Sequence, residues 1–144
     1  MIRSDGSRQP AADSPLARLA RSTPLHVAIG FLLMGGWAAF ANRGHGVQAQ
    51  GLAFVVQGLL SGALTLVLKR GLEAAYARMA PPFDRTVPPM VSCLVIAGVL
   101  TLVHTLAGTP EVLATIAVPW SLSTLYGFIY VFTLPAKAGR KDPP

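Results

Sequence analysis

Long apolar runs separated by short charged segments form the pattern of this chain. Four windows contain no Asp, Glu, Lys or Arg, and they cover residues 22–42, 44–68, 86–110 and 112–136. They hold 96 of the 144 residues, so all 18 charged residues lie in the remaining 48. A helix of about 17–25 apolar residues is long enough to cross the hydrocarbon core of a membrane. The pattern is therefore typical of a polytopic membrane protein.

The apolar runs predict helices rather than strands. Segments such as LVIAGVLTLV and FVVQGLLSGALTLVL are continuously apolar, whereas the strands of membrane barrels alternate over about 10 residues. The predicted fold is all-α, a four-helix transmembrane domain over 24–136. The four spans are expected at about 25–41, 51–68, 87–106 and 113–134.

Basic residues predict the orientation. Lys and Arg concentrate in the segments that remain in the cytoplasm. Eleven of the 12 lie before the first span, between the second and third, or after the fourth, and Arg43 alone lies on the opposite side. Both termini are therefore expected in the cytoplasm, with the protein in the inner (plasma) membrane of a bacterial-type cell. The competing interpretation is a cleaved signal peptide ending at Ala41, because Ala39-Phe40-Ala41 has the small-residue pattern of a cleavage site.

The segments outside the spans are expected to differ in structure. A flexible basic tail is predicted for 1–23 and a second tail for 137–144, because both have little apolar content to bury. In the cytoplasmic loop 69–86, the apolar residues of KRGLEAAYARM recur at helical spacing. The second helix is thus expected to continue past the membrane until Pro81 and Pro82 stop it.

Composition argues against several function classes. The net charge of +6 and pI near 10.3 suggest nucleic acid, but the basic residues flank apolar spans instead of forming one solvated face. We therefore predict no nucleic-acid partner. The single cysteine, Cys93, lies within a span, so neither an intrachain disulfide nor a cysteine-based metal site is expected. The chain has no P-loop and no complete dinucleotide-binding glycine pattern, and no cofactor is predicted.

Small residues predict the faces through which the helices pack. Lipid provides no hydrophobic drive for helix association, so contacts rely on small residues and interhelical hydrogen bonds. In the second span, Gly58 and Gly62 form a GxxxG step beside a polar stripe that contains Ser61. Gly30 and Gly127 are the corresponding small residues of the first and fourth spans. The favoured interpretation is that these faces pack the spans into one four-helix bundle.

Gln57 is the polar side chain that most suggests a site within the spans. An unpaired amide in hydrocarbon is costly, so it must face protein, water or a polar ligand. One interpretation is helix packing, and the other is a polar path or lipid-headgroup slot shared with Ser61 and Ser123. No span contains a carboxylate, the group that proton-driven exporters generally bury in the membrane.

A second candidate polar or lipid site lies at the outer surface. The short loops place Asn42, Arg43 and His45 on the same side as His104, Thr109 and Glu111. A cation and a carboxylate beside two imidazoles suit a phosphate-bearing lipid or a partner's periplasmic face. The competing interpretation is a structural tie from Arg43 to Glu111, with His104 hydrogen-bonded at the interface. The cluster lacks a second carboxylate, which makes it a poor metal or acid–base set.

These patterns predict a non-catalytic membrane protein rather than an enzyme. The leading expectation is an accessory or assembly subunit that packs against lipids and another membrane protein, or against copies of itself. The alternative is a small oligomeric carrier or flippase for a lipid-linked or amphipathic substrate. The length and four-span plan resemble those of small multidrug exporters and polyprenyl-sugar flippases. The resemblance concerns architecture only, because the membrane carboxylate of the exporters' first helix is absent here.

Overall fold

Four long helices make up most of the molecule. The computed structural model describes residues 23–136 of the 144-residue chain. The elements are α2 (Thr23–Ala41), η1 (Arg43–His45), α3 (Gly46–Arg78), η2 (Phe83–Arg85), α4 (Val87–Leu106) and α5 (Val112–Thr133). The described residues contain no strand, which confirms the predicted all-α class, and all four long helices are long and apolar enough to cross a membrane. Apart from Thr23, the predicted tails at 1–23 and 137–144 lie outside the described residues.

The longest helix, α3, extends beyond its predicted span at both ends. It has 33 residues, which corresponds to about 50 Å at the rise of an α-helix. It begins at Gly46, five residues before the expected start, and continues to Arg78, as the helical spacing after Leu68 predicted. Met79 is extended and two prolines follow. Proline lacks the N–H that a helix interior requires, so α3 ends there.

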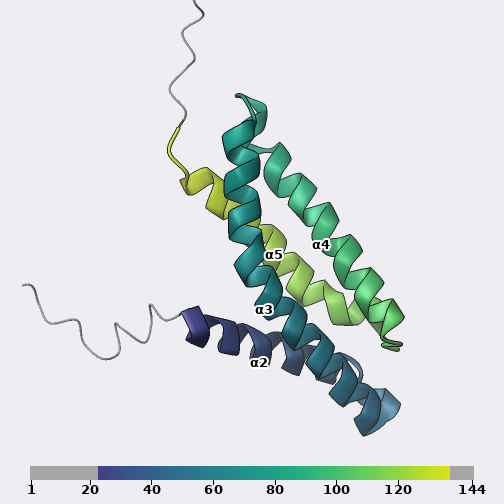
Figure 1. Cartoon of the computed structure of the whole chain (residues 1–144). Helices are drawn as coiled ribbons and strands as arrows, with labels where there is room; N and C mark the ends of the chain where they lie inside the picture. Colours follow the sequence, from purple (N-terminus) through teal and green to yellow (C-terminus); the bar gives the residue numbers. More distant parts are fainter. Residues whose placement is uncertain (1–22, 137–144) are drawn as a thin grey trace, which may run out of the picture.

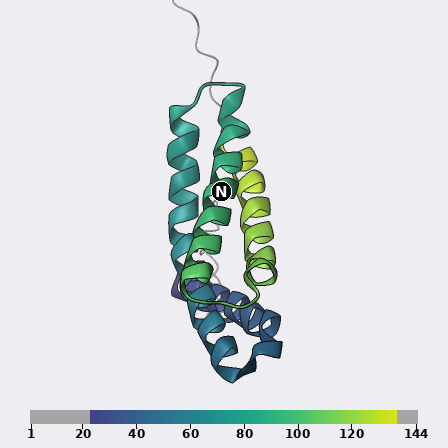
Figure 2. The same ribbon diagram turned by 90° about the vertical axis from the view of Figure 1, so that its right-hand side faces the viewer.

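The helices form two hairpins. α2 packs mainly against α3, and α4 packs mainly against α5. Figure 2 shows α3, α4 and α5 side by side, whereas Figure 1 shows α2 crossing α3 at a steep angle. We call the end formed by residues 42–46 and 107–111 the tip end, and the end formed by residues 69–86 the basic end.

Glycines on α3 allow α2 to approach closely. A Cβ atom at Gly58 would lie 2.7 Å from the ring of Phe31, and one at Gly62 would lie 3.3 Å from Val27. The predicted GxxxG step is therefore covered by α2 of the same chain. It serves packing within the hairpin and is not an outer face open to a partner.

The same interface contains a second close approach. A Cβ atom at Gly35 of α2 would lie 2.8 Å from the backbone oxygen of Phe54 on α3. The Phe31 and Phe54 rings meet edge to face, with centroids 5.4 Å apart, a favourable arrangement for aromatic pairs. Glycine and phenylalanine thus alternate across the α2–α3 contact.

Two apolar clusters join the remaining helices. One is centred on Leu72, Tyr76 and Val131, and the other on Ile96, Leu100 and Ile116. Gly127 of α5 lies near the first cluster, where a Cβ atom would be 3.7 Å from Pro89 and 3.8 Å from Leu72. The α3, α4 and α5 helices therefore share a continuous packed interior, while α2 contacts it from one side.

Side chains of α3 and η2 donate hydrogen bonds to carbonyl groups in the last turn of α5 and in residues 134 and 135 just after it. The Arg85 guanidinium donates to the carbonyl oxygens of Phe132 and Leu134, at 3.1 Å each. The Tyr76 hydroxyl donates to the carbonyl oxygen of Pro135 at 2.7 Å. The last carbonyls of a helix have no intrahelical partner, so these bonds fasten α5 at the basic end.

Adjacent glycines on α2 provide a test of this packing. Gly35→Ala should destabilise the protein by about 1–3 kcal/mol, the usual cost of overpacking, because the new methyl group meets the Phe54 backbone. Gly36→Ala is the matched control, since nothing lies within 4 Å of its Cβ position. Thermal unfolding in detergent measures both variants, and equal melting temperatures would contradict the close approach of α2 and α3.

Candidate functional site

A buried chain of polar side chains crosses from α3 to α4. The Gln57 amide nitrogen donates to the Ser61 hydroxyl at 2.9 Å. The Gln57 amide oxygen lies 2.9 Å from Nε2 of His104, and Nδ1 of His104 lies 2.9 Å from the Thr109 hydroxyl. Because the amide oxygen only accepts, Nε2 of His104 is the donor. In the neutral imidazole, Nδ1 then accepts from Thr109.

These hydrogen bonds give the Gln57 amide, the leading polar candidate within the spans, all its partners within the protein. Gln57 and His104 each have 0% exposure. Both ends of the Gln57 amide are bonded, so the residue connects two helices. The structure therefore gives Gln57 and His104 a common role as neighbours on α3 and α4, although they are 47 positions apart in the sequence.

A second buried network joins the end of α2 to the start of α5. The Asn42 amide nitrogen donates to the Thr115 hydroxyl at 2.8 Å and to the Ala38 carbonyl at 2.9 Å. The Asn42 amide oxygen accepts from the backbone N–H of Glu111 at 3.0 Å. The Thr115 hydroxyl donates to the Glu111 carbonyl at 2.6 Å. Asn42 thus ties the first hairpin to the second at the tip end.

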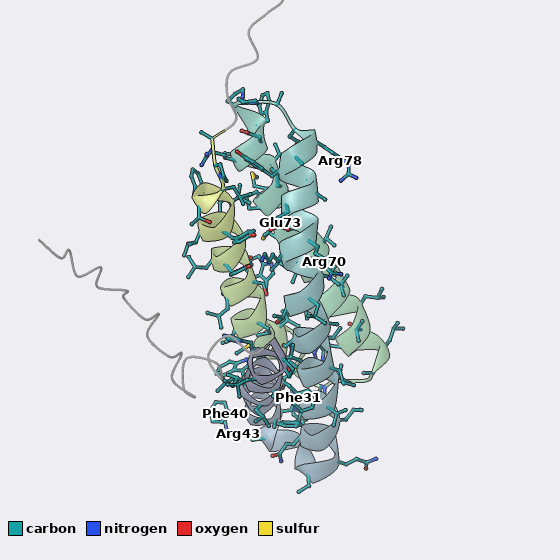
Figure 3. The ribbon with its side chains drawn as sticks, turned by 60° about the vertical axis from the view of Figure 1, so that its left-hand side comes forward. Phe31, Phe40, Arg43, Arg70, Glu73 and Arg78 are labelled. Atoms are coloured by element: carbon teal, nitrogen blue, oxygen red, sulfur yellow. The ribbon has the colours of Figure 1, made fainter. Side chains whose placement is uncertain are left out.

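The exposed part of the predicted outer cluster lies beside this network. His45 Nε2 donates to the Glu111 carboxylate at 2.9 Å. Arg43 instead donates to the Phe40 carbonyl at 3.0 Å and lies 4.2 Å from the Phe40 ring centroid, and Figure 3 shows the two side chains together. Among the described residues, the predicted tie to Glu111 is therefore made by His45. The η1 turn brings Arg43 back over the last turn of α2.

The five predicted polar residues form two groups. Gln57 and His104 are buried and paired. Arg43, His45 and Glu111 line a hollow of about 220 Å³ at the surface of the tip end. The two groups are therefore not one site, because burial removes the first group from contact with a surface ligand.

A larger groove lies between α2, α3 and α5. Its volume is about 600 Å³, within the range of sites that hold small amphipathic molecules. Most of its lining surface is apolar, although six of its twelve lining residues have polar side chains: His26, Ser61, Thr65, Lys69, Ser123 and Tyr126. Gly30 of α2 packs beside Thr65 in this lining, and a Cβ atom at Gly30 would lie 4.0 Å from the Thr65 hydroxyl. The predicted packing residues Gly30 and Ser61 therefore border open space as well as neighbouring helices.

Lys69 was not predicted to be part of a site, because in the sequence it is only one of several basic residues after the second span. Lys69 lines the groove because of the angle at which α2 crosses α3, and the pattern of apolar residues does not predict that angle. The hydrogen bond between Asn42 and Thr115 was also not predicted. The signal that could have suggested it is the position of Asn42, a polar residue at the end of an apolar run.

Removing the buried imidazole should have a much larger effect than removing the exposed one. His104→Leu leaves Gln57 and Thr109 without their shared partner, and each buried orphaned group costs about 1–3 kcal/mol. His45→Ala is the control, because its side chain is 42% exposed and exposed ion pairs contribute about 0–1 kcal/mol. Chemical or thermal unfolding in detergent gives the comparison. Equal losses of stability in the two variants would show that the buried hydrogen bonds of His104 do not hold α3 against α4.

Comparison with known proteins assigns no family: no family model, curated protein or solved structure matches this chain.

Proposed function

We propose that this chain is a non-catalytic protein of the bacterial inner membrane that acts as an accessory or assembly subunit. It crosses the membrane four times with both termini in the cytoplasm. Its outer faces pack against lipids and another membrane component, either a different protein or further copies of itself.

The separation of charges between the two ends supports the orientation. Lys69, Arg70, Arg78 and Arg85 belong to the basic end, whereas Arg43 is the single Lys or Arg among the described residues of the tip end. Basic residues favour the cytoplasmic side. The basic end therefore faces the cytoplasm in this proposal, and the tip end faces the periplasm.

The distribution of polar and apolar side chains is the observation that carries the subunit proposal. The polar side chains of Asn42, Gln57, His104 and Thr115 are buried and bonded to protein groups. Large apolar side chains lie outside, and on α4 alone Leu94 is 72% exposed and Leu102 is 59% exposed. Such a surface suits hydrocarbon and helix contacts, while the polar interior stabilises the bundle.

The groove between α2, α3 and α5 favours a second candidate function. A carrier or flippase for a lipid-linked or amphipathic substrate requires a space lined by both apolar and polar groups, and the groove has both. A path across the membrane would also have to pass the level of Gln57. That residue is fully buried, and for this reason the subunit function is preferred.

Reporter fusions test the orientation. Green fluorescent protein fused after residue 144 should fluoresce, because it folds in the cytoplasm. Alkaline phosphatase inserted at Gly44 should be active, because it requires the periplasm. The same two reporters placed after Arg78 give the reciprocal control. A C-terminal fusion that does not fluoresce would contradict the topology. So would a phosphatase that is inactive when inserted at Gly44 but active when placed after Arg78.

Purification in a mild detergent separates the two functions. A subunit should bring down a membrane protein in a fixed ratio, or should elute as a defined oligomer. A carrier should elute without a protein partner and with one lipid-linked molecule per site. Mass spectrometry of the eluate identifies both, and a monomer free of bound protein would contradict the subunit proposal.

A further inference from the structure

The groove between α2, α3 and α5 contains hydroxyl groups that have no hydrogen-bond partner among the described residues. Of the five Ser and Thr side chains of α5, only Ser123 bonds to no other described residue, whereas Ser121 donates to the Ala117 carbonyl at 2.7 Å. The Tyr126 hydroxyl makes no hydrogen bond within residues 23–136 either. Both residues line the groove. An unpaired hydroxyl in hydrocarbon is costly, so Ser123 and Tyr126 need a polar partner in the groove.

The α3 wall of the groove adds two further donors. The Ser61 hydroxyl oxygen accepts from the Gln57 amide at 2.9 Å, and a hydroxyl that accepts still has its own hydrogen to donate. Lys69 contributes an ammonium group to the lining, and an ammonium group only donates. The Thr65 hydroxyl is already used, because it donates to the Ser61 carbonyl at 2.7 Å. These polar groups thus offer mainly donors, and a ligand that complements them presents acceptor oxygens.

The charge at the basic end of the groove is close to balanced. Glu73 follows Lys69 by about one turn on α3, and its carboxylate accepts a hydrogen bond from the Tyr130 hydroxyl. The Lys69 ammonium lies 6.0 Å from the centroid of the same Tyr130 ring. Figure 3 labels Glu73 on this part of α3. A cation and a carboxylate thus meet at a single tyrosine, and a neutral ligand suits the groove better than a charged one.

The donors lie at two depths along the groove. Lys69 is eight residues after Ser61 on α3, which corresponds to about 12 Å along the helix axis. On α5, Tyr130 meets Glu73, and Ser123 lies about 10 Å closer to the tip end than Tyr130. One leaflet contributes about 15 Å of hydrocarbon, so in the proposed membrane-inserted state the two serines lie near the middle of the membrane. Glycerolipids keep their ester carbonyls at the interface, whereas these donors require acceptor oxygens at both depths.

We propose that the groove binds the ring of an isoprenoid quinone. Near the basic end, one carbonyl oxygen of the ring accepts from Lys69 and Tyr126. The opposite oxygen accepts from Ser61 and Ser123, deeper in the membrane. The ring is neutral and its carbonyl oxygens only accept, as the donors and the balanced charge require. The groove has a volume of about 600 Å³, and most of its lining surface is apolar, which suits the ring and the start of its apolar chain.

Titration of the detergent-purified full chain tests the ligand class. Isothermal titration calorimetry gives the affinities for decylubiquinone, dioctanoylglycerol and dioctanoyl phosphatidylglycerol, and native mass spectrometry gives the number of molecules bound. We expect one decylubiquinone per chain, bound more tightly than either glycerolipid. Dioctanoylglycerol is neutral but carries its carbonyl groups at one end, and phosphatidylglycerol adds a negative charge that the groove does not complement.

Two serines on α5 give a matched pair of variants. Ser123→Ala removes a donor from the groove and should weaken decylubiquinone binding about fivefold, the factor that one hydrogen bond contributes. Ser121→Ala removes the same group outside the groove lining, where the hydroxyl bonds to Ala117 of its own helix, and should leave the affinity unchanged. Tyr126→Phe keeps the ring but removes the hydroxyl, and should weaken binding by a similar factor.

A second pair of variants tests the apolar part of the groove. Gly30→Leu places a side chain in the groove and should abolish the single bound quinone. Gly36→Leu adds the same side chain to α2 where nothing lies within 4 Å of the Cβ position, and should leave binding unchanged. Circular dichroism and melting temperature show whether each variant remains folded. If Gly30→Leu melts early, Met34→Trp, which enlarges another lining residue of α2, takes its place.

Three results would overturn the proposal. They are binding of either glycerolipid as tightly as decylubiquinone, no difference between Ser123→Ala and Ser121→Ala, or a change in oligomeric mass instead of bound quinone on filling the groove. The last would assign the groove to another copy of the chain. The proposal goes beyond the subunit function and rests on the membrane insertion proposed above. Recovery of the protein in the soluble fraction without detergent would contradict that insertion itself, so the two failures are distinguishable.

Discussion

The hydrogen-bond requirement of buried polar side chains is the constraint on which the arrangement of this bundle depends. His104 has a partner at each ring nitrogen, Gln57 on α3 and Thr109 beyond the end of α4. Apolar burial is non-directional, whereas a shift of α4 by one turn would separate these atoms and leave them buried without partners. The hydrogen bonds among Gln57, His104 and Thr109 therefore set the register of α4 on α3, while the apolar clusters provide most of the contact area.

Asn42 imposes the corresponding constraint on the other hairpin. Its amide reaches Thr115 and the backbone of Glu111, so the end of α2 is held at the start of α5. Each hairpin thus contributes a polar side chain near its tip that bonds to the other hairpin. At the opposite end, Arg85 and Tyr76 donate to carbonyls in the last turn of α5 and in the two residues just beyond it. The helices are fastened at both ends, and between them the packing depends on shape.

The groove is a consequence of this arrangement. Close contact at Gly35, Gly58 and Gly62 holds α2 against α3, and the tie at Asn42 holds the end of α2 near α5. The steep angle of α2 then separates its first half from α5 (Figure 1), and the groove occupies that region. The groove and the proposed subunit surface thus differ in origin. The first arises from the angle between helices, and the second arises from the apolar residues that face outward on every helix.

The sequence alone determined the number, type and approximate limits of the helices, because long uncharged runs leave few alternatives and prolines end α3. It also identified Gln57, His104, Gly58 and Gly62 as residues that need a neighbour, since the cost of an unpaired amide or the advantage of a glycine step follows from residue type. Tertiary structure alone decided which neighbour each one has. Gln57 meets His104, Gly58 meets Phe31, and Glu111 meets His45 instead of Arg43. These pairings depend on the angles and rotations of whole helices, which many weak contacts determine together and which no local pattern of residues records.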